Sequence, residues 1–256
     1  MLFIGNSYTF LPGQGSPSDP GLPKLVSRIA ESIDPSLKIH YFFHTPGGYG
    51  FELHFSDEES LRLMKMPYDK VVLQGQSVES LELTPWWEQH GNSGVKSFSV
   101  YLPKVLDLVF TSNTDVTLYV NWGWSFKNAL LQADHPGLFF PAGSSRAGQK
   151  WCGESPFELQ KMIDESYLRW SRDYPVVLSR VGDAWLLLRS VGVADEDEFY
   201  IPDDWSHPSA LGSFVAALAL VRDSLRLDVS KNSYVPSGID PARARLIQGV
   251  LARKKV

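Results

Sequence analysis

Short apolar runs alternate with segments of helical periodicity along the whole chain, and this alternation restricts the fold more than any other feature of the sequence. The runs are apolar throughout, which is typical of strands buried on both faces of a sheet. Strands of this kind with helices between them predict a mostly parallel sheet covered by helices on both sides. We therefore expect an α/β protein, built as a three-layer α/β/α sandwich around a central five-stranded sheet.

The positions of the strands and helices follow from the spacing of apolar residues. Strands are expected at residues 2–5, 38–43, 70–75, 116–122 and 176–181. The main helices are expected at residues 25–33, 98–110, 157–170, 210–225 and 241–251. An apolar fraction of 43% is enough for a sizeable core. Together these elements predict one doubly wound, flavodoxin-like domain over residues 1–256.

Two stretches are too long for simple connections between these elements, residues 77–97 and 123–155. Loops of such length in compact domains are usually functional or disordered. Both stretches are rich in aromatic residues, which favours ordered loops. We expect them to lie over the functional site.

Composition excludes several classes of partner. The net charge is −5, whereas proteins that bind nucleic acid usually show a basic face. No window approaches ~18 uninterrupted apolar residues, so we expect no membrane span. Cys152 is the single cysteine and can form no intrachain disulfide. Met1 runs directly into an apolar segment without a visible signal peptide, which indicates a cytoplasmic protein as the sequence stands, or a periplasmic or secreted one if a signal has been removed. The sequence does not indicate an oligomeric state.

Ser7 is the first candidate for chemistry, because it stands just past the end of the first expected strand. This places it at the carboxyl edge of the sheet, where open α/β sheets bind ligands. Gly5 allows the chain to leave the strand sharply. Taken alone, the position fits a nucleophile or a serine that caps the next helix.

A second candidate is the segment Asp204-Trp205-Ser206-His207-Pro208. Pro208 is suited to a first helical position, so His207 would lie at the mouth of the following helix, where the helix dipole favours a neutral ring. Asp204 can accept a hydrogen bond from the ring and thereby set its tautomer. An aspartate three residues before a histidine is a weak motif by itself, and it also fits a surface loop.

Two further segments follow expected strands. Gly47-Gly48 lies after the second strand and allows a backbone N–H to approach a ligand closely, although such a segment taken alone is more often a plain turn. Gln76 ends the third strand and could present an amide donor or simply cap the strand. In a doubly wound sheet these strand ends lie side by side. Ser7, Gly48 and Gln76 would then meet the loop of His207, which supplies the groups that acyl transfer needs.

In these segments the chain resembles the SGNH (GDSL-like) hydrolases. Gly5-Asn6-Ser7 is similar to their first block, usually glycine-aspartate-serine, and Asp204-x-x-His207 is similar to their last. The resemblance implies serine-dependent hydrolysis of a carboxylic ester, with Ser7, Asp204 and His207 as catalytic residues. It also implies an oxyanion hole of Ser7, Gly48 and Gln76, with Gly47 as the fallback for Gly48. Asn6 replaces the usual aspartate, and Gln76 stands where asparagine is usual.

The aromatic residues of the two long loops suggest a substrate class. Trp86, Trp124 and Trp151 are interleaved with hydrogen-bonding side chains, a mixture that suits a sugar face and its hydroxyl groups. We therefore expect a small-molecule or carbohydrate ester, with a short acyl group such as acetyl on a carbohydrate. The alternative interpretation is that these tryptophans pin the loops to the domain.

Two other functions fit the same residues. One is an acyltransferase on the same fold, and the other is a degenerate, non-catalytic domain that binds glycans. The presence of Ser7, Asp204 and His207 together argues against the second. No cofactor and no metal are expected, since the remaining histidines lack a metal-like pairing with cysteine or carboxylate.

Overall fold

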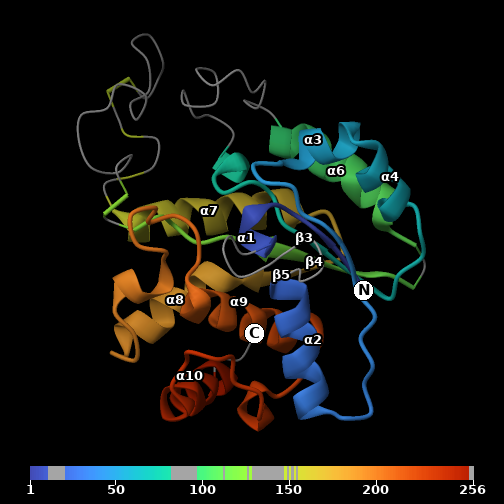
Figure 1. Cartoon of the computed structure of the whole chain (residues 1–256). Coiled ribbons are helices and arrows are strands. Elements are labelled where there is room, and N and C mark those ends of the chain that lie inside the picture. Colours follow the sequence, from blue (N-terminus) through green and yellow to red (C-terminus); the bar gives the residue numbers. More distant parts are fainter. Residues whose placement is uncertain are drawn as a thin grey trace.

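Five strands form one parallel sheet at the centre of the molecule (Figure 1). Their order is β2-β1-β3-β4-β5, and every neighbouring pair is parallel. They span β1 (Leu2–Ile4), β2 (Phe42–His44), β3 (Lys70–Leu73), β4 (Asp115–Val120) and β5 (Val176–Arg180). The computed structural model describes residues 1–10, 21–81, 97–111, 113–125, 127–128, 147–148, 150, 153 and 155–253. Trp86 and Trp151 lie outside these residues.

Helices cover both faces of the sheet (Figure 1). On one face lie α2 (Leu22–Ile33), α8 (Val181–Ser190), α9 (Ala210–Ser224) and α10 (Pro241–Arg253). On the other lie α3 (Phe51–Ser56), α4 (Glu58–Met64), α6 (Ser97–Val109) and α7 (Pro156–Ser171). The expected three-layer, flavodoxin-like sandwich is confirmed, and all described strands are parallel. In the part of the chain that the structure describes, no helix is both long and apolar enough to cross a membrane.

Side chains of the sheet alternate between two cores. Phe3, Val72 and Tyr119 enter the core under α9, whereas their neighbours such as Ile4 and Leu118 enter the core under α6. This alternation follows from the two-residue period of a strand. Because both sides are apolar, the strand sequences are apolar throughout, as a doubly covered sheet requires.

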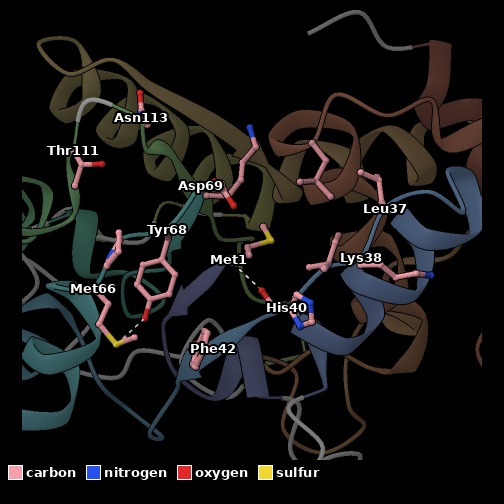
Figure 2. Close-up of a pocket in the computed structure, with 14 residues that line it drawn as sticks. Met1, Leu37, Lys38, His40, Phe42, Met66, Tyr68, Asp69, Thr111 and Asn113 are labelled. Atoms are coloured by element: carbon pink, nitrogen blue, oxygen red, sulfur yellow. Dashed lines mark hydrogen bonds between the residues drawn. The ribbon is translucent and has the colours of Figure 1, made fainter.

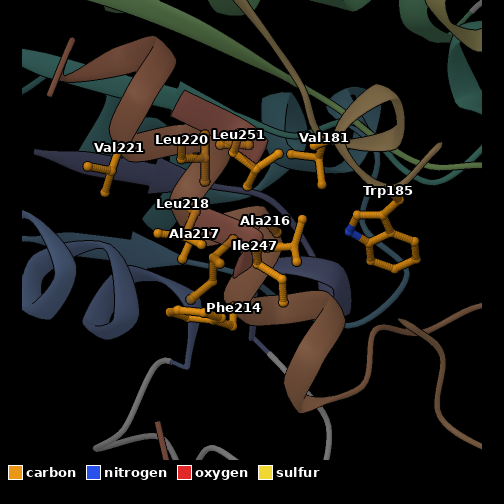
Figure 3. Packing of buried hydrophobic residues seen from close by; sticks show 14 of the residues in the cluster. Val181, Trp185, Phe214, Ala216, Ala217, Leu218, Leu220, Val221, Ile247 and Leu251 are labelled. Carbon is orange, nitrogen blue, oxygen red and sulfur yellow. The ribbon is translucent and has the colours of Figure 1, made fainter. Parts of the chain in front are cut away.

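Helix α9 is buried on nearly all sides, which explains its unusually apolar sequence. It lies between the sheet and α10, whose Ile247 and Leu251 belong to the same core (Figure 3). At Gly212 an added Cβ would lie 2.3 Å from the carbonyl oxygen of Phe199, so only glycine allows this approach. The amino end of α9, which follows His207, is therefore fixed by core packing.

The structure corrects some of the expected elements. The second strand covers residues 42–44 and not 38–43, because it lies at the sheet edge and pairs only with the three residues of β1. The short helices α3 and α4 were not expected, since neither is long enough to show a clear helical period. Helix α8 begins at the residue after β5, so the apolar residues of the two elements merge in the sequence.

Candidate active site

Ser7, His207 and Asp204 form a chain of hydrogen bonds at the carboxyl edge of the sheet. The Ser7 Oγ lies 2.8 Å from His207 Nε2, and His207 Nδ1 is hydrogen-bonded to Asp204 Oδ2. A carboxylate only accepts, so Nδ1 carries the proton and Nε2 can accept from the serine hydroxyl. The side chains of His207 and Asp204 are 26% and 33% exposed, so a ligand can reach them.

The Asp204 carboxylate organises the turn that carries His207. Its Oδ1 accepts from the backbone N–H of Ser206 at 3.0 Å, from the Ser206 hydroxyl and from the N–H of His207 at 3.3 Å. Burial alone would raise the pKa of Asp204, but the hydrogen bonds of Ser206 and the charge and hydrogen bonds of His207 hold this pKa below its usual value. The ionised carboxylate can thus stabilise a positive charge on His207.

This turn holds two residues in the left-handed region, Asp203 with φ 71° and Trp205 with φ 56°. Residues other than glycine rarely adopt this conformation, so the surrounding contacts must hold it. The Trp205 N–H donates to the carbonyl of Ile201 at 3.0 Å, and the Ser125 N–H donates to the carbonyl of Trp205 at 3.0 Å. The start of the 123–155 segment therefore packs on the turn of Asp204.

The sequence suggested that Pro208 begins a helix, but it does not. It pairs with Tyr200 in an isolated antiparallel bridge, and the N–H of Ile201 donates to the carbonyl of His207 at 2.9 Å. Ser209 caps α9 instead, accepting from the N–H of Gly212 at 3.1 Å. His207 thus lies in the bend just before the helix and not within its first turn.

Tyr8 packs against the ring of His207. The two rings meet edge to face, with centroids 5.1 Å apart. Tyr8 stacks on Trp122 at 4.8 Å, and Trp122 stacks on Trp185 at 4.3 Å. Burial raises the pKa of the Tyr8 phenol to about 12, so this ring stays neutral at physiological pH. The imidazole therefore rests on an aromatic column that continues into the core.

Asn6 and Gln74 hold the turn that presents Ser7. The Asn6 side chain accepts from the N–H of Tyr8 at 3.1 Å and donates to the carbonyl of Tyr49 at 2.9 Å. Gln74 Oε1 accepts from the N–H of Asn6 and from the hydroxyl of Thr9, both at 3.0 Å. An aspartate at position 6 could only accept, so the departure from the usual block provides a donor toward Tyr49.

The expected oxyanion donors stand on the two neighbouring loops. Gly48 has φ +76° and no atom within 4 Å of an added Cβ, so it forms an open turn after β2. Gln76 follows β3, and its Oε1 accepts from the Ser77 hydroxyl at 3.1 Å. In the described residues, the N–H groups of Ser7 and Gly48 and the Nε2 of Gln76 donate to no other group.

Trp124 does not form the exposed platform that the sequence suggested. Its ring is 4% exposed, and its Nε1 donates to the Tyr8 Oη at 3.2 Å. It is a packing residue beneath the site, so we correct its assignment to substrate binding. A tryptophan at the start of a long loop looks the same in a sequence whether the loop buries it or exposes it.

Several residues of the site were not singled out from the sequence. Tyr8 and Ser206 adjoin Ser7 and His207, and this adjacency was the available signal. Gln74 is a lone polar residue at the end of an apolar run, and it is fully buried. Such a residue needs a buried partner, which the sequence alone could not name.

A separate cavity lies at the opposite edge of the sheet (Figure 2). It measures about 560 Å³, and its lining includes Met1, His40, Phe42 and Tyr68. Met1 precedes β1, so this cavity faces the amino ends of the strands, whereas Ser7 lies at their carboxyl ends. Among the described residues, no three His, Cys, Asp or Glu side chains are grouped to hold a metal ion.

No family model and no curated protein sequence matches the chain. Several solved structures, in contrast, are similar to the chain. A DUF4886 family protein from Bacteroides uniformis superposes with a TM-score of 0.62 at 16% identity, covering 98% of this chain and 92% of that one. A protein assigned to the SGNH hydrolases, from Slackia heliotrinireducens, gives 0.59 at 17% identity over 87% and 97%. The chain has the SGNH hydrolase fold.

A third similar structure carries a substrate class in its name. A catalytic mutant of Axe2, an acetylxylan esterase from Geobacillus stearothermophilus, superposes with a TM-score of 0.57 at 14% identity. The match covers 86% of this chain and 91% of that one. At this identity the likeness concerns the fold, and the resemblance drawn from the sequence blocks is confirmed at that level.

Proposed function

We propose that this SGNH-fold protein is a hydrolase that cleaves a carboxylic ester through Ser7. The observation that carries the proposal is the 2.8 Å contact between Ser7 Oγ and His207 Nε2, with Nδ1 of the same ring on Asp204. A ring held in this way accepts the hydroxyl proton while the carboxylate stabilises the resulting cation. The Ser7 oxygen is then a competent nucleophile at neutral pH.

The reaction follows from these positions. Ser7 Oγ attacks the ester carbonyl and His207 takes its proton, which forms a tetrahedral oxyanion. The N–H groups of Ser7 and Gly48 and the amide of Gln76 bind that oxyanion. Collapse releases the alcohol, which receives the proton from His207, and leaves an acyl group on Ser7. Water then attacks the acyl group with His207 again as base, and the acid and free Ser7 are formed.

The proposed substrate is an ester with a short acyl group, most simply acetyl on a carbohydrate. A long acyl chain needs a continuous apolar tunnel, because each buried methylene contributes about 0.8 kcal/mol. Beside Ser7 and His207, the described residues Asn6 and Ser206 are polar. The acetylxylan esterase with this fold supports the same class. Trp86 and Trp151 remain the proposed sugar contacts, and Trp124 is no longer one.

The test combines a serine-directed phosphonate with a panel of esters. Mass spectrometry should locate the phosphonate on Ser7, and label on another serine with Ser7 untouched would refute the mechanism. kcat/KM is then compared for acetyl, butyryl and octanoyl esters and for acetylated sugars. Preference for octanoyl esters with no turnover of acetylated sugars would replace the carbohydrate assignment by a lipase-like one. Acyl transfer to an added sugar in preference to water would reassign the protein as an acyltransferase.

A further inference from the structure

Three loops carry the proposed oxyanion donors, and buried side chains connect each pair of them. Asn6 connects the Ser7 loop to the Gly48 loop through its 2.9 Å hydrogen bond to the carbonyl of Tyr49. Gln74 connects the strand that precedes Gln76 to the Ser7 loop, accepting from the N–H of Asn6 at 3.0 Å. The remaining connection, between the Gly48 loop and Gln76, is made by Glu79.

Glu79 lies in the short helix η1 (Glu79–Leu81), and it is 4% exposed. Its Oε1 accepts from the backbone N–H of Phe51 at 2.9 Å. Its Oε2 accepts from the backbone N–H of Gln76 at 2.8 Å. Phe51 begins α3 directly after the Gly48 loop. One carboxylate thus sets the distance between two loops that carry proposed oxyanion donors.

The surrounding chain leaves space for this carboxylate. An added Cβ at Gly50 would lie 2.6 Å from Glu79 Oε1, and one at Gly75 would lie 3.0 Å from Oε2. Neither glycine has a positive φ, so space and not backbone conformation favours glycine at both positions. At Gly50 that space is taken by Glu79 alone, and at Gly75 by Glu79 together with the rings of Phe98 and Phe51. Two loops are therefore built around the same side chain.

We propose that Glu79 is a positioning residue for the oxyanion hole, and this inference rests on the proposed function. Its carboxylate holds Gln76 and the Gly48 loop at the spacing that the developing oxyanion requires. The side chain is buried and acts through these backbone groups. A carboxylate suits two N–H donors because both oxygens only accept. Glutamine has the same shape, but its NH₂ group would face one of the two N–H donors and break that hydrogen bond.

The test is Glu79→Gln, with Glu165→Gln as the matched control. Glu165 lies on α7 with 61% of its side chain exposed, and its carboxylate pairs with Lys161. Active sites are counted with the phosphonate, so that misfolded protein does not enter kcat. Removing one oxyanion donor costs about 10²- to 10³-fold in kcat, so a displaced donor should cost roughly tenfold or more. KM should change little, and Glu165→Gln should match the wild type.

A double-mutant cycle with Gln76→Ala distinguishes a positioning role of Glu79 from a purely structural one. If Glu79 acts by placing Gln76, the second substitution costs less kcat in the Glu79→Gln background than in the wild type. Lower thermal stability with unchanged kcat per titrated site, or fully additive effects on kcat, would overturn the inference while leaving the proposed function intact.

Amide protons give a measurement on the wild type should Glu79→Gln fail to fold. The N–H groups of Phe51 and Gln76 should resonate downfield and exchange slowly with solvent, as expected for donors to a buried carboxylate. Fast exchange at both would refute the Glu79 contacts. A wild type that neither hydrolyses esters nor reacts at Ser7 would overturn the proposed function and this inference with it.

Discussion

The indole Nε1 of Trp122 donates a 2.9 Å hydrogen bond to the carbonyl oxygen of Ser206, the residue before His207. Trp122 follows β4 and is 1% exposed. The same ring stacks between Tyr8 and Trp185. The turn of the proposed base is therefore attached to the sheet through one side chain of the core.

Replacing Trp122 by phenylalanine should loosen this turn. The Ser206 carbonyl loses its donor, and a buried group without its partner costs about 1–3 kcal/mol. We expect lower stability to urea together with roughly tenfold lower kcat, since small displacements of catalytic groups slow reactions strongly. Trp170→Phe is the control, because the Trp170 Nε1 has no hydrogen-bond partner in the described structure. Equal losses of kcat in both variants would contradict the role of the hydrogen bond.

Ser7→Ala should remove nearly all turnover and leave folding intact. Triad members contribute on the order of 10⁴-fold or more to kcat. Ser7 is only half-buried and its hydroxyl contacts His207, so the melting temperature should stay close to that of the wild type. Ser237→Ala, at an exposed position, should retain full activity. Residual turnover above a few per cent in Ser7→Ala would exclude Ser7 as the nucleophile.

Gln76→Ala should lower kcat by about 10²- to 10³-fold with a small change in KM, as expected for loss of one oxyanion donor. The backbone N–H groups of Ser7 and Gly48 would remain. Steady-state kinetics on a short acyl ester provides the measurement. An unchanged kcat would remove Gln76 from the mechanism.

Asn6→Asp would restore the residue that is usual in the resembled block. Here it should destabilise the protein, because aspartate cannot donate to the carbonyl of Tyr49 and places an acceptor against it. The expected loss is about 1–3 kcal/mol in the free energy of unfolding, from urea titrations near pH 7. Asn113→Asp, at an exposed turn, is the control and should change little. A stability equal to the wild type would mean that the loop adjusts to the aspartate.

His54 should make stability depend on pH. Burial lowers its pKa from 6.5 to about 4, and its Nε2 donates to the carbonyl of Gly5 at 2.9 Å. Between these values the unfolded chain binds a proton that the folded protein does not, so stability falls as pH falls from 6.5 toward 4. The contribution lost is about 3 kcal/mol. Urea unfolding across this range should show the effect in the wild type and in His40→Gln, which changes an exposed histidine, but not in His54→Gln.

Much of the fold was predictable from the sequence because burial on both faces leaves a strong signal. The runs at β1, β3 and β5 are largely apolar and end near glycine or polar residues, so the predicted limits of these strands lie close to the observed ones. β2 was misplaced because an edge strand is only partly buried. Ser7 and His207 could be paired from their places at a strand end and before a helix. The roles of Gln74 and Glu79 could not be predicted, because a polar residue near a strand end looks like a cap until its partners are known.

Ser7 and His207 touch across 200 residues of sequence. During synthesis the histidine follows the serine only after all five strands of the sheet have been made. The contact then depends on α9, whose buried position requires α10 as cover. A nascent chain therefore carries an unactivated serine until the residues of α9 and α10 have been made. Reactivity of Ser7 toward a phosphonate would report that the chain has folded as far as α10, and a chain that ends before α9 would not react with the phosphonate.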